Sequence, residues 1–285
     1  MPQVRANGVN LAYREWGEGD TTLLFIHGNL ASKEWISLAA PHFPRGVRTI
    51  AIDWRGCGDS ERPVPTADFA NYSIATHAAD MLAALDALGV SFCHLATHST
   101  GGIISTRMLL AQPERFGRVF ALSPVSPRSI PFTQAQLDMF LQMKANPAFA
   151  RMVMAMTAPS LFVSTAPGQP PKFRPDAGAR ADLFERILAQ TMSVSDGIWL
   201  GTPIGLTREF ESGELFARMG DIRHPHLIAW GEYDGIIAKA DLELMVKGLP
   251  DCRLSVVPDV GHSLNLEDPE LYAGYLGGWL SGNAV

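Results

Sequence analysis

The chain has 285 residues, of which 47% are hydrophobic and 18% are charged, and its formal net charge is −6 at pH 7. This length suits one folded core or a core with one large insertion, and the composition argues against a disordered chain. The net negative charge argues against a basic surface that would bind the phosphate backbone of a nucleic acid, so we expect no nucleic-acid partner.

Short apolar runs recur along the first half and the last quarter of the chain. Runs that are apolar throughout are typical of strands covered on both faces, as in a parallel sheet between helices. The runs that we predict as strands span residues 8–14, 21–27, 47–53, 92–98, 117–123, 226–231 and 253–258.

Helical periodicity fills segments between these runs. From Ile74 to Leu88 apolar side chains recur at spacings of three and four residues, and Gly89 follows as a C-cap. A second helix is predicted over residues 268–280, where Asp268 and Pro269 form a strong start signal. Strands that alternate with helices predict a doubly wound α/β domain.

One segment between about residues 128 and 222 breaks this alternation. It shows no convincing strand, is rich in Met, Phe and Pro, and includes the loop-like sequence Ala-Pro-Gly-Gln-Pro-Pro at residues 166–171. We therefore predict a core formed by residues 1–127 and 223–285, and a largely helical cap formed by residues 128–222.

Residues 97–102, Thr-His-Ser-Thr-Gly-Gly, follow a predicted strand directly and precede a helical pattern. A serine on such a sharp turn carries its hydroxyl clear of the sheet, and the helix N-terminus points free N–H groups toward it. Gly101 and Gly102 would let the strand and the helix pass closely. An ordinary turn with a surface serine is the alternative interpretation of this pattern alone.

This turn resembles the nucleophile elbow G-x-S-x-G of the α/β-hydrolase family, with Ser99 as the nucleophile and Thr97 in place of the first glycine. The resemblance implies the α/β-hydrolase fold, a mostly parallel sheet flanked by helices with a helical cap insertion. It also implies a Ser-His-Asp triad that requires no cofactor and no metal. A serine followed by Thr100 argues against the haloalkane dehalogenases and epoxide hydrolases of the family, which use an aspartate nucleophile.

Two further strand-end motifs carry the partners that the resemblance implies for Ser99. His262 follows the last predicted strand and takes the position of the general base, which removes the serine proton and returns it to the leaving group. Asp234 follows the preceding strand and takes the position of the acid that orients the histidine. The alternative acid position after residues 117–123 has no carboxylate.

His27-Gly28-Asn29-Leu30 resembles the oxyanion loop of the family. The backbone N–H groups of Asn29 and Thr100 take the positions of the two oxyanion donors, while His27 is interpreted as bracing the loop. Residues 53–60 resemble a further signature, D-x-R-G-x-G-x-S, which implies a salt-bridge network below the active site.

We assign Leu30, His98 and Trp199 as candidate substrate-binding residues, although packing is the commoner role for such side chains. The apolar, Met-rich cap predicts that the substrate carries a small to medium hydrophobic group. From the resemblance we expect a carboxylic-ester hydrolase that forms an acyl-enzyme on Ser99, with a small-molecule ester or lactone as substrate.

Three alternatives remain open. The same triad could open a lactone, or it could cleave a carbon–carbon bond in a meta-cleavage product. The third alternative is a receptor-like ligand-binding protein with little turnover. The chain shows neither a signal peptide nor about 18 consecutive apolar residues, so we expect a cytoplasmic protein without a membrane span. Its oligomeric state cannot be read from the sequence.

Overall fold

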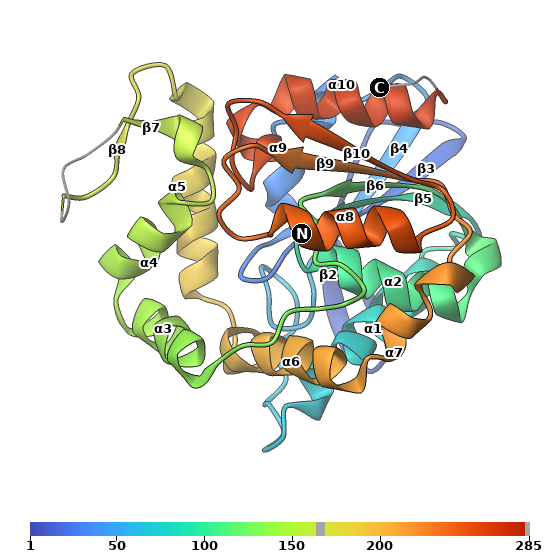
Figure 1. Ribbon diagram of the computed structural model, residues 1–285, viewed down its shortest axis with the longest axis horizontal. Helices are drawn as coiled ribbons and strands as arrows, with labels where there is room; N and C mark the ends of the chain where they lie inside the picture. Colours follow the sequence, from blue (N-terminus) through green and yellow to red (C-terminus); the bar gives the residue numbers. More distant parts are fainter. Residues whose placement is uncertain (164–168, 283–285) are drawn as a thin grey trace.

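The computed structural model describes residues 1–163 and 169–282, which form one eight-stranded sheet between layers of helices (Figure 1). Part of the predicted loop at 166–171 therefore lies outside the described residues. The strand order is β1-β2-β4-β3-β5-β6-β9-β10. The strands are β1 (Gln3–Ala6), β2 (Val9–Trp16), β3 (Thr21–Ile26), β4 (Val47–Ile52), β5 (Cys93–His98), β6 (Phe116–Leu122), β9 (His226–Gly231) and β10 (Cys252–Val257).

All seven predicted strands are present, and the sheet is mostly parallel as expected. The neighbouring strands from β4 to β10 pair in parallel, whereas β1 and β2 run antiparallel to their neighbours. The sequence missed β1, because four residues at a sheet edge are too few to show a periodic pattern.

Helices cover both faces of the sheet. In Figure 1, α10 (Pro269–Leu280) lies on one face, and α1 (Ile74–Ala87), α2 (Gly101–Ala111) and α8 (Lys239–Gly248) lie on the other. The predicted start of α10 is confirmed, since the Asp268 side chain accepts a hydrogen bond from the Leu271 N–H at 2.9 Å. No helix within the described ranges is both long enough and apolar enough to cross a membrane.

The segment between β6 and β9, which we call the cap segment (residues 128–222), lies beyond one end of the sheet and along its lower side in Figure 1. Its helices are α3 (Gln134–Ala145), α4 (Pro147–Ala155), α5 (Gly178–Met192), α6 (Thr202–Ser212) and α7 (Glu214–Ala217). One expectation was wrong, because two short strands, β7 (Phe162–Val163) and β8 (Lys172–Phe173), pair here antiparallel. Two residues per strand leave no alternation for a sequence pattern to reveal.

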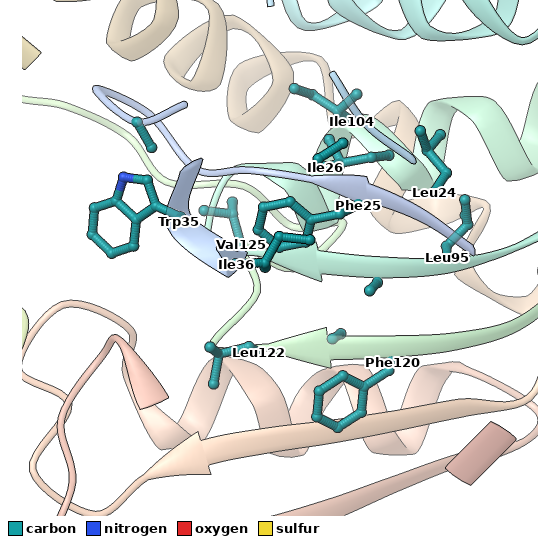
Figure 2. Packing of buried hydrophobic residues seen from close by; sticks show 14 of the residues in the cluster. Leu24, Phe25, Ile26, Trp35, Ile36, Leu95, Ile104, Phe120, Leu122 and Val125 are labelled. Carbon is teal, nitrogen blue, oxygen red and sulfur yellow. The ribbon is translucent and has the colours of Figure 1, made fainter. Parts of the chain in front are cut away.

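Apolar side chains of the central strands, of α2 and of the loops at the strand ends fill the core (Figure 2). The labelled side chains are those of Leu24, Phe25, Ile26, Trp35, Ile36, Leu95, Ile104, Phe120, Leu122 and Val125, all of them buried. Burial of such a side chain stabilises the fold by about 1.5–3 kcal/mol. The same packing fixes the strand ends, from which the loops described below emerge.

A buried ion pair joins the loops that follow β3 and β4, as the motif at residues 53–60 led us to expect. The ammonium of Lys33 is fully buried and lies 2.7 Å from the Asp53 carboxylate and 2.6 Å from that of Asp59. The Lys33 N–H also donates to Asp53 Oδ1 at 2.7 Å. Burial alone would lower the pKa of Lys33, but the two carboxylates raise it, so the side chain stays charged.

Replacing Lys33 by methionine, Lys33→Met, should therefore destabilise the protein strongly. The substitution leaves Asp53 buried without its counter-ion, which typically costs about 3–5 kcal/mol of unfolding free energy. Urea denaturation followed by circular dichroism measures this difference.

The matched control is Lys239→Met, because Lys239 is about half exposed and lies 3.9 Å from Glu243 on the same helix. Its loss should change the unfolding free energy by less than about 1 kcal/mol. Equal effects of the two substitutions would contradict a special role for the buried pair.

Candidate active site

The carboxyl ends of the parallel strands meet at one edge of the sheet, on the side where α3, α4 and α5 of the cap segment lie (Figure 1). The loop after β3 carries Asn29, and the turn after β5 carries Ser99. The loops after β9 and β10 carry Asp234 and His262. Because β3 pairs with β5 and β9 pairs with β10, the sheet order alone sets each pair of loops side by side.

Ser99 occupies a strained turn between β5 and α2. Its φ is +53°, a left-handed conformation that non-glycine residues seldom adopt. Three backbone hydrogen bonds hold it: the Ser99 N–H donates to Leu122 O at 3.0 Å, and the Ser99 carbonyl accepts from Gly102 at 2.9 Å and Val125 at 2.8 Å. Ser99 is half-buried while both of its chain neighbours are buried, so the turn presents this residue outward.

Glycines make room for this turn. A Cβ on Gly28 would lie 2.9 Å from the Ser99 Cβ, and a Cβ on Gly101 would meet the backbone carbonyls that end β3. Thr97, which departs from the family pattern, is fully buried in β5 and pairs with Ile26 and Ala121 on the neighbouring strands. Close approaches that require glycine therefore fall at Gly28 and Gly101, and also at Gly102, where a Cβ would lie 2.5 Å from the Pro124 Cβ.

Asp234 and His262 form a buried hydrogen-bonded pair. His262 Nδ1 lies 2.9 Å from Asp234 Oδ2, and the other carboxylate oxygen accepts from the N–H groups of Ile236 at 2.8 Å and Ile237 at 3.1 Å. Burial alone would raise the pKa of Asp234, but His262 and these backbone donors hold it below its usual value. The carboxylate is therefore ionised and orients the imidazole through Nδ1, and among the described residues no hydrogen-bond partner binds Nε2.

A second buried carboxylate fixes the histidine loop from behind. Glu267 accepts from the N–H groups of Gly261 at 2.8 Å and Ser263 at 3.4 Å, on either side of His262. Its other oxygen accepts from the Ser160 N–H at 3.0 Å, in the cap segment. Burial raises the pKa of Glu267. This side chain therefore ties the cap segment to the histidine loop.

His98 lies inside the protein beneath His262. Its Nε2–H donates to the His262 carbonyl at 3.0 Å, and its ring centroid is 4.8 Å from that of His262 and 5.1 Å from that of Trp35. Burial lowers the pKa of His98 to about 3, so the ring is neutral. At 2% exposure the side chain supports the histidine loop, and a contact with substrate stays a prediction.

The two predicted oxyanion donors lie on the loop after β3 and at the start of α2. Across the described part of the chain, the N–H groups of Asn29 and Thr100 have no hydrogen-bond acceptor. His27 braces the first loop, since its Nδ1–H donates to Gly28 O at 2.8 Å and its Nε2 accepts from the Trp54 N–H at 3.2 Å. Burial lowers the pKa of His27 to about 3.

Helix α5 of the cap segment binds the same loop, a contact that no local pattern of residues predicts. The Thr191 hydroxyl donates to the carbonyl of Leu30 at 2.6 Å, and the Ser32 hydroxyl donates to Gln190 Oε1 at 2.6 Å. Leu30 itself has φ +55° and is 8% exposed. The residues that meet here are about 160 positions apart, beyond the reach of any local pattern.

Trp199, the third predicted substrate-binding residue, lies in a π-helical turn, Gly197–Gly201, before α6. Its side chain is fully buried, and its indole N–H finds no partner among the described residues. Contact between Trp199 and substrate therefore stays a prediction. Over residues 1–163 and 169–282, no three His, Cys, Asp or Glu side chains gather closely enough to hold a metal ion.

Replacing Glu267 by glutamine should destabilise the protein. The amide NH₂ of glutamine would take the place of the carboxylate oxygen that accepts from the Ser160 N–H, so two donors would face each other. Loss of one buried acceptor costs about 1–3 kcal/mol. The difference in unfolding free energy between the wild type and Glu267→Gln should also grow as the pH falls from 7 toward 4.5, the ordinary pKa of a glutamate side chain. Because the raised pKa makes the folded protein bind this proton more tightly than the unfolded chain, lower pH stabilises only the wild type through Glu267.

Thermal unfolding of both proteins at several pH values measures this difference. Glu270→Gln is the control, since Glu270 is exposed on α10. Its unfolding temperature should follow that of the wild type at every pH. A Glu267→Gln deficit that is independent of pH would contradict the assigned pKa shift.

Comparison with known proteins agrees with this architecture. A family model described as alpha/beta hydrolase fold matches residues 21–269. The protein named "Putative carbamate hydrolase RutD" from Azorhizobium caulinodans is 28% identical over 278 residues, 95% of each chain. The enol-lactonase of Burkholderia xenovorans LB400 has a TM-score of 0.79 at 17% identity, over 98% of this chain and 100% of that one. An esterase of Exiguobacterium antarcticum has a TM-score of 0.77 at 18% identity, over 98% of both chains. The chain thus belongs to the α/β-hydrolase fold family.

Proposed function

We propose that the protein is a serine hydrolase that cleaves the carboxylic ester of a small to medium hydrophobic molecule through an acyl-enzyme on Ser99. The observation that carries this proposal is the buried 2.9 Å contact between His262 and Asp234, at the sheet edge where Ser99 lies in a strained turn. Nucleophile, base and orienting acid are the three parts that acyl transfer by a serine requires.

In the first half of the reaction, Ser99 Oγ attacks the carbonyl carbon while His262 Nε2 takes the hydroxyl proton. Asp234 stabilises the imidazolium that forms, without taking the proton itself. The negative charge that develops on the carbonyl oxygen is held by the free N–H groups of Asn29 and Thr100. His262 then gives its proton to the departing alcohol, which leaves the acyl group on Ser99.

In the second half, a water molecule repeats the attack with His262 again as the base, and the acid product leaves Ser99. Residues 1–127 and 223–285 form the catalytic core in this proposal, and the cap segment at 128–222 covers the substrate. A small molecule is the only partner that the mechanism needs.

Lactone hydrolysis is the second candidate function. A lactone is an ester whose alcohol stays tethered, so the same triad opens it without a further group. Because the fold is similar to that of the enol-lactonase, we retain lactone hydrolysis as a candidate together with the hydrolysis of open-chain esters. A panel of lactones and open-chain esters with the same number of carbons separates the two. An enzyme that cleaves carbon–carbon bonds, or a ligand-binding protein without turnover, would hydrolyse neither the lactones nor the open-chain esters.

A fluorophosphonate probe should label the folded wild type at Ser99, and Ser99→Ala should abolish the labelling. Loss of the nucleophile should also lower ester turnover by about a millionfold. Labelling is read by intact-protein mass spectrometry and turnover with p-nitrophenyl acetate.

The matched control is Ser281→Ala, because Ser281 is exposed at the end of α10. It should be labelled as fully as the wild type. Absence of labelling in the folded wild type would refute the serine nucleophile and favour a ligand-binding protein.

Thr191→Val should lower kcat about three- to tenfold with little change in KM. The substitution keeps the size of the side chain but removes the hydroxyl that donates to the Leu30 carbonyl, one residue from the proposed oxyanion donor Asn29. A neutral hydrogen bond of this kind contributes about 0.5–1.5 kcal/mol.

Thr191→Ser is the control, because serine retains the hydroxyl and should restore most of kcat. If valine and serine lowered kcat equally, the loss would come from packing, and the hydrogen bond would have no part in placing the oxyanion loop.

A further inference from the structure

Helix α5 of the cap segment contacts both the loop of the proposed base and the loop of the first proposed oxyanion donor. In Figure 1 it lies between α4 and the edge of the sheet. It packs against α9 (Leu264–Glu267), which begins two residues after His262, and against the 3₁₀-helix Lys33–Ile36, which follows the oxyanion loop. One cap helix therefore lies against two catalytic loops that are distant in sequence.

Near the start of α5, Arg180 binds the histidine loop. Its Nη1–H donates to the backbone carbonyl of Glu267 at 2.8 Å, and its Nη2–H donates to the Asp176 carbonyl at 2.8 Å. The carboxylate of the same Glu267 accepts from the N–H groups on either side of His262. The guanidinium of Arg180 thus fixes the residue that holds the proposed base.

Near the end of α5, Gln190 and Thr191 bind the oxyanion loop through the two 2.6 Å hydrogen bonds to Ser32 and Leu30. Arg180 and Thr191 are 11 positions apart in this helix. At a rise of about 1.5 Å per residue, the two attachment points are about 16 Å apart along the helix axis. The helix therefore spans the distance between the two loops.

A third contact joins the two loops directly. The Asn265 side chain, fully buried in α9, donates to the Trp35 carbonyl at 2.8 Å. The oxyanion loop, α9 and α5 are therefore hydrogen-bonded to one another in pairs. None of the three can shift relative to the other two without loss of at least one of these bonds.

α5 is itself fixed in the cap segment. Arg151 of α4 pairs with Glu185 at 2.8 Å and lies 5.9 Å from the ring centroid of Phe184. One face of α5 is buried, through the side chains of Leu183, Phe184, Ile187 and Leu188. A helix packed in this way can transmit a displacement from one of its ends to the other.

We propose that α5 is a brace that sets the position of the oxyanion loop relative to the histidine loop, with Arg180 and Thr191 as positioning residues at its two ends. The proposal rests on the proposed ester hydrolysis at Ser99. In that reaction the substrate carbonyl must reach the Asn29 N–H while its leaving alcohol meets His262, so the rate depends on how the loops are placed. Charge develops at both places only in the transition state, so release of the brace lowers kcat and leaves KM nearly unchanged.

The test measures kcat and KM for p-nitrophenyl acetate with Arg180→Met, Thr191→Val and the double variant. Each single substitution should lower kcat about threefold to tenfold, the effect of one lost hydrogen bond. Release of either end frees the brace, so the double variant should be no slower than the slower single variant. Substitutions this far apart otherwise act independently, and their effects on kcat would then multiply to about ninefold to a hundredfold.

Arg186→Met is the matched control, because Arg186 is exposed on α5 between the two ends. It removes the same charge from the same helix and should leave kcat at the wild-type value. Arg180→Lys keeps a donor for the Glu267 carbonyl and should restore part of kcat. Circular dichroism confirms that each variant is folded.

Hydrogen exchange read by mass spectrometry tests the brace without any substrate. Arg180→Met should speed exchange of the amides in residues 30–36 about threefold to tenfold, although it lies at the other end of α5. Thr191→Val should do the same for residues 261–267. Arg186→Met should change neither segment.

Multiplied effects in the double variant, a change in KM alone, or exchange that is unaltered at the distant loop would overturn the brace and leave the serine mechanism intact. Absence of both fluorophosphonate labelling and ester turnover in the wild type would instead overturn the proposed function. The exchange measurement would then still decide whether α5 joins the two loops.

Discussion

The left-handed backbone at Ser99 is the constraint on which the site depends. A non-glycine residue in this conformation stores about 1–3 kcal/mol and persists only where the surroundings fix it. Here the fixing groups are Leu122 at the end of β6, Val125 just beyond it, and Gly102 in the first turn of α2. The parallel pairing of β5 with β6 brings two of these groups to Ser99, so the sheet itself maintains the strain.

The histidine is held as firmly as the serine, but by polar side chains. Asp234 binds its ring, His98 binds its carbonyl, and Glu267 binds the N–H groups on either side of it. These three residues come from different parts of the chain and are all buried. An imidazole fixed in this way needs little reorganisation when charge develops on it, which is how a preorganised site lowers a reaction barrier.

Seven of the eight strands of the large sheet and the order of strand-end motifs could be predicted from the sequence, because each depends on a local run of residues. The two-residue strands β7 and β8 could not, since they depend on an approach between segments rather than on alternation. The same holds for the contact of Thr191 with Leu30. His98 lies at the end of β5 and is 2% exposed, and its contact with substrate stays a prediction.

The hydrogen bonds from α5 to the loop at residues 30–32 bear on how such proteins diverge. A cap attached only at its two ends could be exchanged between relatives as an independent cassette. Here the cap segment also contributes Gln190 and Thr191 to the support of the core loop. A transplanted cap would therefore have to bring equivalent hydrogen-bonding groups at the end of its own helix, or the loop at residues 30–32 would lose this support.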